Sequence, residues 1–321
     1  QDLCTVALLP SQHSLHLVLE MTAQGHTVRA ELVDAHTNVV SLERDGEPLY
    51  LCQEQPCYAE SETDRSFMSI EGIYDFAMTV DLSRVQALLD RQIACNLRIA
   101  QEGLTGRYGA AVGATLLEEA PDDIKTVAKA YAAAGSDARM SGCSLPVVIN
   151  SGSGNQGITV SLPVIKYAQY LGCSQEKLYR ALLLSNLVSI HEKSGMGRLS
   201  AYCGAVTAAC GAGAGITYLC GGDFETISRT ITNTLANVSG IICDGAKPSC
   251  AAKIASSVGA AILAHTLSMK GRSFHSGDGI VGSDLEDTVS NVTILARDGM
   301  RQTDDEILKI MTQPVKKGEA Q

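Results

Sequence analysis

The stretch Asn150-Ser-Gly-Ser-Gly-Asn-Gln-Gly157 lies inside a run without a charged side chain, from Met140 to Ile165. It combines three glycines, two serines and three carboxamides, and apolar residues flank it on both sides. Such a loop exposes many backbone N–H groups and small hydroxyls at one point, which is how proteins hold a carboxylate or a phosphate. We therefore predict an anion-binding loop, and the rest of the chain must indicate the fold around it and the anion it takes.

Within this stretch, Gly152-Ser-Gly-Asn-Gln-Gly157 matches the Gly-x-Gly-x-x-Gly pattern of dinucleotide-binding turns. That pattern requires a helix directly after the loop and a second parallel strand ending in an acid. Leu145 to Ile149 could form the preceding strand, but we expect Pro163 to interrupt any helix that starts at the loop. We therefore set the nucleotide interpretation aside. A plain flexible loop and a loop that binds a small carboxylate remain, and the polar side chains favour the second.

Alternating apolar and polar residues predict strands near the start of the chain. A hairpin turn is expected at Ala23-Gln-Gly25, and a second turn at Asp45-Gly46. The expected strands are His13–Glu20, His26–Val33, Thr37–Glu43 and Glu47–Leu51. Together they form an antiparallel meander, which we interpret as part of a larger, incomplete sheet.

Residues 52–66 are polar and read as a linker, and from Phe67 the apolar spacing becomes helical. Helices are expected within 81–100, 121–131, 174–187, 224–238, 250–269, 284–296 and 303–311. We place Ser136-Asp-Ala-Arg139 on a polar turn just before the glycine-rich loop. The predicted fold class is α+β: a small antiparallel β-containing domain plus linker, residues 1–65, precedes a mostly helical catalytic domain, residues 66–321.

Composition excludes several function classes. Hydrophobic residues make up 45% of the 321 residues and aromatic residues only 4%, so the core must be built from small aliphatic side chains in closely packed helices. The net charge of −10 provides no basic stripe for a nucleic acid. Ala201–Gly222 lacks charge over about the length of a membrane span, but it is rich in small residues. We interpret it as a buried helix and expect no membrane association.

The 11 cysteines are odd in number and scattered, which favours reduced thiols in the cytoplasm over a disulfide framework. Cys203 and Cys243 match no metal-binding spacing, so chemistry alone favours structural thiols at both positions. Cys250 is either a further ligand or another buried thiol. Arg139 has two open interpretations: it binds a carboxylate, or it pairs with Asp137.

Several motifs, in this order, resemble one family. They are His36-Thr-Asn-Val-Val40, Gln101-Glu-Gly-Leu-Thr-Gly106, Ser136-Asp-Ala-Arg-Met140, the glycine-rich stretch through Thr159, Arg198-Leu-Ser-Ala201 and Ile242-Cys-Asp-Gly-Ala246. The chain resembles, from about His26 to Met311, the L-cysteine desulfidase / L-serine dehydratase-like iron–sulfur ammonia-lyases. The resemblance implies a 4Fe–4S cluster bound by Cys203 and Cys243, and it reverses the structural interpretation of those two thiols.

The family resemblance also implies the other site residues. Candidate catalytic residues are His36, Ser151 and Ser153. Candidate substrate-binding residues are Asn38, Ser136, Asp137, Arg139, Ser151, Gly152, Ser153, Gly154, Asn155, Gln156 and Arg198. The general base is not identified among these residues.

The chain departs from the family pattern in one respect. Family members carry a further N-terminal segment with a Leu-Gly-Cys-Thr-Glu-Pro motif, whose cysteine is the expected third ligand, and this sequence lacks it. Either the segment was removed, another chain supplies it, or Cys250 substitutes, and the chain alone is expected to be inactive or impaired. The helices rich in small residues suit a core or a homodimer interface equally well.

The implied activity is elimination of L-cysteine to sulfide, ammonia and pyruvate. Alternatives are L-serine dehydration to pyruvate and ammonia, or a homologue that binds a small amino acid without a cluster.

Overall fold

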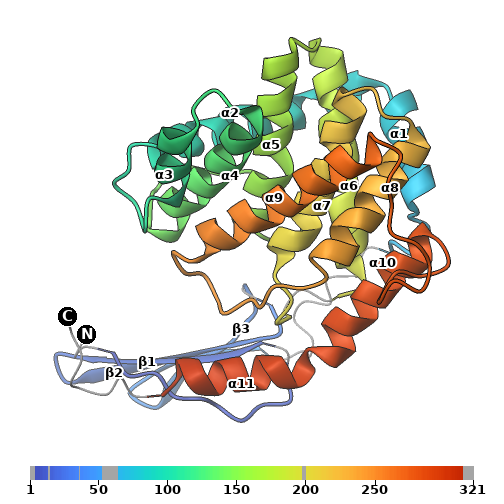
Figure 1. Cartoon of the computed structure of the whole chain (residues 1–321). Coiled ribbons are helices and arrows are strands. Elements are labelled where there is room, and N and C mark those ends of the chain that lie inside the picture. Colours follow the sequence, from blue (N-terminus) through green and yellow to red (C-terminus); the bar gives the residue numbers. More distant parts are fainter. Residues whose placement is uncertain (1–3, 14, 36, 53–63, 197–199, 314–321) are drawn as a thin grey trace. The chain divides into compact units, whose positions relative to one another are not determined.

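The computed structural model describes residues 4–13, 15–35, 37–52, 64–196 and 200–313, and Figure 1 draws their arrangement. The chain groups into two compact units: Gln1–Ser66 with Leu308–Gln321, and Phe67–Ile307. The first unit contains all the strands of the described residues, and the second is built almost entirely of helices. The predicted α+β class is confirmed. The sequence-based division assigns everything after residue 65 to the helical domain, whereas the last residues group with the strands.

The strands are β1 (His16–Ala23), β2 (His26–Val33), β3 (Val39–Arg44) and β4 (Glu47–Leu51). They form one antiparallel sheet in the order β1-β2-β3-β4, which confirms the predicted meander. Gln24 with Gly25, and Asp45 with Gly46, have positive φ at both positions, as two-residue turns between twisted strands require. The two predicted turns are therefore confirmed.

Five helices share a simple start signal: side chains at Ser69, Asp123, Ser174, Asp223 and Asp284 accept first-turn N–H groups. The helices of the second unit are α1 (Ile70–Thr79), α2 (Gln86–Gly103), α3 (Val112–Glu119), α4 (Ile124–Met140), α5 (Gly154–Leu171), α6 (Gln175–Ser194), α7 (Gly204–Leu219), α8 (Phe224–Asn237), α9 (Cys250–Ser268) and α10 (Leu285–Ile294). A 3-10 turn, η1 (Leu82–Arg84), precedes α2; a π turn, η2 (Leu295–Gly299), and α11 (Arg301–Met311) follow α10.

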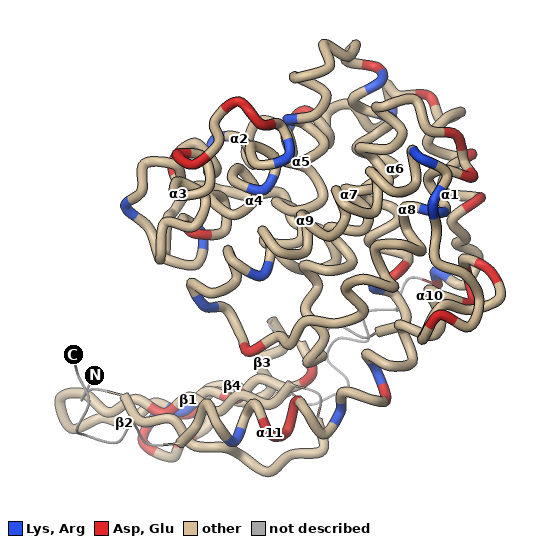
Figure 2. The backbone as a smooth tube through the Cα atoms, viewed as in Figure 1, with Lys and Arg blue, Asp and Glu red and all other residues tan. Residues whose placement is uncertain are grey.

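Helix α7 lies at the centre of the helical unit, against α5, α6, α8 and α9. It carries no charged residue, in contrast to the charged outer helices in Figure 2. Nearly all of its side chains are buried, which confirms the buried helix predicted within Ala201–Gly222. Small residues let its backbone approach α6: a Cβ added at Gly211 would lie 2.3 Å from the Ser185 carbonyl oxygen.

Three local predictions are wrong. Pro163 lies inside α5 and does not stop it. An interior proline costs about 3 kcal/mol, whereas each fully buried aliphatic side chain contributes roughly 1.5–3 kcal/mol. Ile158, Leu162 and Ile165 are all buried here, so packing outweighs the lost hydrogen bond. Residues 144–149 form no strand.

Ser136–Arg139 is not a turn but the last part of α4. That helix begins at Ile124, after the predicted start at residue 121, because the Asp123 carboxylate accepts the N–H groups of Lys125 and Thr126. Its buried alanine-rich face carries it on to Met140.

Two apolar helices bear on the membrane question. α9 is long and apolar enough to cross a membrane by length and composition, but half of its most apolar window is buried within the unit. α7 is shorter and is the most enclosed helix of the unit.

Nine of the described cysteines are free thiols, while Cys52 is disulfide-bonded, so the expectation of reduced thiols is wrong for Cys52.

We predict that Gly211→Ala destabilises the protein by about 1–3 kcal/mol, because the added methyl group meets a backbone oxygen that cannot move without shifting α6. Gly259→Ala is the matched control: its added Cβ would meet only the Lys129 side chain at 3.5 Å. The measurement is the midpoint of urea unfolding for both variants. Equal midpoints would contradict the role of α7 backbone contact.

Candidate functional site

The glycine-rich stretch forms a tight turn that leads directly into a helix. Asn150 and Ser153 exchange backbone hydrogen bonds of 3.1 and 2.9 Å. Between them, Ser151 has φ +47° and Gly152 has φ +81°, the positive values that such a turn requires. Helix α5 then begins at Gly154. The stretch is therefore a hydrogen-bonded turn at the start of a helix.

The other two glycines of the pattern serve close packing. A Cβ at Gly157 would lie 1.9 Å from the Val148 carbonyl oxygen, so the segment before the turn lies directly on α5. Asn96 of α2 fastens this contact: its Oδ1 accepts the Val148 N–H at 3.0 Å and its Nδ2 donates to the Gly157 carbonyl at 3.0 Å. A Cβ at Gly154 would lie 2.3 Å from Nε of Arg139. Packing thus explains the glycine spacing, and the only sheet among the described residues is antiparallel, unlike a dinucleotide fold.

The start of α5 presents unused donors. Ser153 is the N-cap residue, but its side chain makes no capping hydrogen bond. The first N–H groups of a helix have no intrahelical partner, which leaves those of Gly154, Asn155 and Gln156 available for an anion. The Arg139 guanidinium lies over Gly154 and donates to Oδ1 of Asn155 at 3.2 Å. Backbone donors and a cation therefore meet at one point.

Arg139 does not pair with Asp137, so that sequence interpretation is wrong, and its binding of a carboxylate stays a prediction. Oδ2 of Asp137 accepts the Gly113 N–H at 2.9 Å, and burial raises the pKa of this carboxyl group. Burial lowers the pKa of Arg139, and within the described ranges Arg139 forms no ion pair. Ser136 is fully buried beside Asp137. Asp137 thus has a backbone partner, whereas the Arg139 guanidinium has no carboxylate partner among the described residues.

A buried carboxamide network holds the turn from behind. Nδ2 of Asn150 donates to Oδ1 of Asn186 at 3.0 Å, and the amides of Asn186 and Gln92 hydrogen-bond each other twice at 3.0 Å. Oδ1 of Asn150 accepts from Ser151 at 2.9 Å and from Ser189 at 3.3 Å. The Ser151 hydroxyl therefore donates to an amide oxygen, which is not a base and does not activate it.

Cys203 and Cys243, far apart in sequence, are brought together by a short backbone bridge. Cys203 N–H donates to the Ile241 carbonyl at 2.8 Å, and Cys243 N–H donates to the Ala201 carbonyl at 2.6 Å. The two sulfurs affect each other: the Cys203 thiol lowers the pKa of Cys243, while the Cys243 sulfur and burial raise the pKa of Cys203. Cys203 is also the N-cap residue of α7, but its side chain makes no capping hydrogen bond.

Cys250 lies close enough to interact electrostatically with Cys203 and Arg139. It is the first residue of α9, and its Sγ donates to the Gly245 carbonyl at 3.6 Å. Next to it, Lys253 pairs with Asp244 and donates to the Ile242 carbonyl at 2.9 Å.

The three candidate ligand cysteines come from separate segments: the start of α7, the segment before α9, and the first residue of α9. Within the described part of the chain, no three His, Cys, Asp or Glu side chains gather closely enough for one metal ion. Soft thiols from three segments, with cations beside them, are the donors that iron–sulfur clusters use.

Gln156 connects the turn to the cysteines. Its side chain is 7% exposed, and its Oε1 has no partner among the described residues. A Cβ at Gly204 would lie 2.4 Å from Cδ of Gln156, so this amide lies on the first residue of α7, next to Cys203. The loop and the thiol pair therefore belong to one site.

Three predicted site residues are not among the residues described above. His36 and Arg198 fall outside the described residues. Asn38 belongs to the strand unit, where its Nδ2 donates to the Val33 carbonyl at 2.8 Å. Their proposed roles stay predictions.

Sequence reasoning missed the end of α6. Glu192 and Lys193 are 0% and 7% exposed, although charged residues at a helix end normally lie in water. Both oxygens of Glu192 lack partners among the described residues, as does the buried hydroxyl of Tyr202. The one sequence feature that could have indicated these residues is their place in the chain: His191-Glu-Lys-Ser194 comes shortly before the Arg198 motif.

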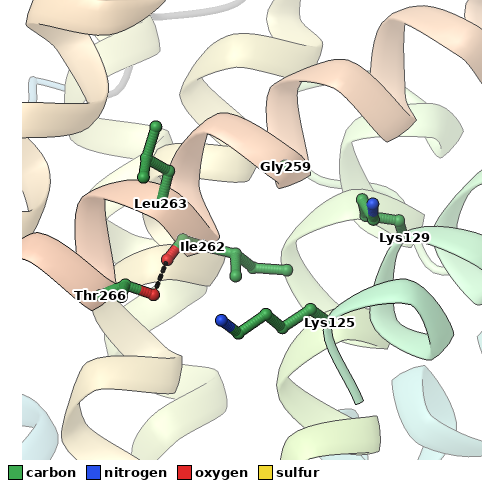
Figure 3. A pocket seen from close by; sticks show the side chains of 6 residues that line it. All are labelled: Lys125, Lys129, Gly259, Ile262, Leu263 and Thr266. Atoms are coloured by element: carbon green, nitrogen blue, oxygen red, sulfur yellow. Dashed lines mark hydrogen bonds between the residues drawn. The ribbon is translucent and has the colours of Figure 1, made fainter. Parts of the chain in front are cut away.

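Two cavities lie away from these residues. One, of about 450 Å³, is lined by Arg98, Gln101, Glu102, Tyr108, Cys143, Ser144 and Leu145. The other, of about 230 Å³, lies between α4 and α9, with Lys125, Lys129, Gly259, Ile262, Leu263 and Thr266 around it (Figure 3). Neither is lined by the turn or by the three candidate ligand cysteines.

Comparison with known proteins identifies the family of this chain. The chain belongs to the serine dehydratase alpha chain family, whose pattern matches residues 13–309. It is 54% identical over 308 residues to a UPF0597 protein of Lachnoclostridium phytofermentans, covering 96% of this chain and 74% of that protein. A UPF0597 protein of Desulfitobacterium hafniense is 50% identical over 306 residues, covering 95% of this chain and 71% of that protein. A UPF0597 protein of Treponema denticola is 46% identical over 318 residues, covering 96% of this chain and 73% of that protein. The resemblance to serine dehydratase-like proteins is confirmed at the level of the family.

We predict a pH-dependent stability term from Glu192. Burial raises its pKa from 4.5 to about 8, so between these values the folded protein binds more protons than the unfolded chain, and stability falls as pH rises. Glu192→Gln removes this titration. The variant should gain stability over the wild type from pH 5 to pH 8, by more than about 1 kcal/mol at the upper end.

Urea unfolding at several pH values measures this gain, and Glu118→Gln, at an exposed glutamate, is the matched control. A difference between wild type and Glu192→Gln that stays constant with pH would contradict the prediction.

Proposed function

We propose that this chain is an iron–sulfur-dependent lyase that removes the β-substituent of a small L-amino acid. The observation that carries the proposal is the shared site of the α5 start and the Cys203–Cys243 pair, within a chain of the serine dehydratase alpha chain family. L-Serine would give pyruvate and ammonia, and L-cysteine would give sulfide as well. The family favours L-serine, whereas the better leaving group is the thiolate of L-cysteine. A protein of this kind would be soluble and cytoplasmic.

The substrate carboxylate would bind at the start of α5. The N–H groups of Gly154, Asn155 and Gln156 donate to it, and the Arg139 guanidinium balances its charge. Ser151, Gly152 and Ser153 shape the turn that orients these donors. Because the donors are fixed before the substrate arrives, little ordering is needed on binding.

Cys203, Cys243 and Cys250 would hold a 4Fe–4S cluster. When bound with one iron open, such a cluster supplies a Lewis acid that lowers the pKa of a hydroxyl or thiol leaving group. Lys253 pairs with Asp244, so this carboxylate next to Cys243 is not free. Gln156, with its unpaired Oε1, is suited to accept a hydrogen bond from the substrate ammonium group.

The proton on Cα needs a base. Ser153 is better suited than Ser151, whose hydroxyl already donates to Asn150, and His36 remains the alternative. For the third cluster ligand, the alternative to Cys250 is a cysteine from an N-terminal segment.

We predict that Arg139→Met raises KM for the amino acid roughly 10–100-fold with a smaller effect on kcat, because a charged hydrogen bond to the carboxylate is lost. Arg139→Lys should restore part of the affinity, since it keeps the charge but not the planar fork. Initial rates of pyruvate release measure both, and Arg107→Met, at an exposed arginine, is the control. An unchanged KM in Arg139→Met would place the carboxylate elsewhere.

We also predict that Cys203→Ala or Cys243→Ala abolishes cluster binding and lyase activity after anaerobic reconstitution, whereas Cys173→Ala does neither. Cys173 lies at the far end of α5 from the turn and serves as the matched thiol control. Iron and labile sulfide per chain, with pyruvate and sulfide release from L-serine and L-cysteine, are the measurements. Equal losses in all three variants would count against the assignment, and a protein that binds the amino acid without iron would support a cluster-less homologue.

Cys250→Ala distinguishes the two sources of the third ligand. Loss of the cluster assigns the third position to Cys250. Full retention of iron and sulfide leaves that position to a cysteine from another segment or chain.

A further inference from the structure

The larger of the two cavities has a polar lining, and three separate segments of the chain form its walls. Helix α2 contributes Arg98, Gln101 and Glu102, the loop between α2 and α3 contributes Tyr108, and the segment after α4 contributes Ser144. Its volume of about 450 Å³ is that of a small-molecule site. Because most such sites are largely apolar, a lining of this kind indicates a small ligand that carries charges of its own.

The α2 wall holds two opposite charges that do not pair with each other. Arg98 and Glu102 are one helical turn apart, so they lie on the same face of α2. Glu102 accepts hydrogen bonds from the Arg107 guanidinium and from the Tyr108 hydroxyl, both at 2.9 Å and both at Oε1. Among the described residues, Oε2 of Glu102 accepts no hydrogen bond and Arg98 forms no ion pair. One guanidinium and one carboxylate oxygen are therefore available to a ligand.

Hydrogen bonds already connect the three walls. The two bonds to Glu102 connect α2 to the loop. Oδ1 of Asn96, also on α2, accepts the Val148 N–H at 3.0 Å and so connects α2 to the segment after α4. The Cys143 N–H donates to the Ala138 carbonyl at 3.0 Å, which joins the start of that segment to the end of α4. Because the walls are held in place beforehand, a ligand loses little free energy to ordering them.

We propose that this cavity is a second binding site, and that it takes a free α-amino acid with a polar side chain. The carboxylate of the ligand pairs with Arg98, and its ammonium group donates to Oε2 of Glu102. The Gln101 amide and the Ser144 hydroxyl bind its side chain. A simple anion would leave Glu102 without a partner and a simple cation would leave Arg98 without one, whereas a zwitterion satisfies both. The inference does not rest on the proposed function, because the cavity is lined neither by the turn nor by the candidate ligand cysteines.

The test is calorimetric titration of the whole chain with L-glutamine. Arg98→Met should weaken binding roughly 10–100-fold, because a charged hydrogen bond to the carboxylate is lost, and Glu102→Gln should weaken it by a similar factor. Arg91→Met is the matched control: Arg91 is an exposed arginine of the same helix that does not line the cavity. This variant and Arg139→Met, at the turn, should leave the affinity for L-glutamine unchanged.

Two analogues assign each charge of the ligand to one residue. The amide of L-glutamine lacks the carboxylate, and N-acetyl-L-glutamine lacks the ammonium group. Arg98→Met should not weaken binding of the first any further, and Glu102→Gln should not weaken binding of the second any further. The urea midpoints of all variants show whether they are folded, and Arg98→Gln replaces Arg98→Met in the same titrations if that variant is not.

The outcomes separate this inference from the proposed function. A wild-type protein that binds neither L-glutamine nor L-serine overturns the inference, and so does equal weakening by Arg98→Met and Arg91→Met. Acetate bound as tightly as L-glutamine would also overturn it, because the site would then take any small anion. Loss of L-glutamine binding in Arg139→Met but not in Arg98→Met overturns the inference and supports the proposed carboxylate site at the turn. The expected L-glutamine binding in a reconstituted protein that releases no pyruvate overturns the proposed function alone.

Discussion

Backbone-to-backbone contact is the constraint on which this site depends. Gly157 lets the chain at Val148 lie directly on α5, and Gly211 lets α7 lie directly on α6. Each contact removes the space that one methyl group would need, so the elements approach more closely than larger side chains allow. The buried Asn96 amide satisfies the polar backbone groups at the first contact, where they would otherwise be costly.

This close packing brings helix starts together. Helix α5 begins at the turn, α7 begins just after Cys203, and α9 begins at Cys250. The start of a helix carries a partial positive charge of about half a unit. The starts of α5 and α7 meet where Gln156 lies on Gly204, so they favour anions at one place, whether a carboxylate or a thiolate. The same packing that stabilises the helical unit thus also prepares the site electrostatically.

The sequence predicted the parts of the structure that depend on local pattern. Period-two alternation gave the four strands, and the Ser174 cap gave the start of α6. It failed where tertiary packing outweighs a local preference: the buried face of α5 carries the helix through Pro163. The Cys203–Cys243 pairing was implied by family resemblance alone, because a bridge between distant segments leaves no spacing pattern. Lys193 was missed because burial of a charge at a helix end cannot be read from periodicity.

The charge distribution bears on which substrate suits the site. The chain carries a net charge of −10, so a multiply charged anion approaching from solution is repelled. A small amino acid is a zwitterion with no net charge, and this long-range field hardly affects it. In the proposed function, its carboxylate would be bound only over short distances, by the α5 start and Arg139. A locally positive site in an acidic protein would then disfavour phosphates and dicarboxylates relative to a zwitterion, which is the charge preference that the proposed elimination from L-serine or L-cysteine requires.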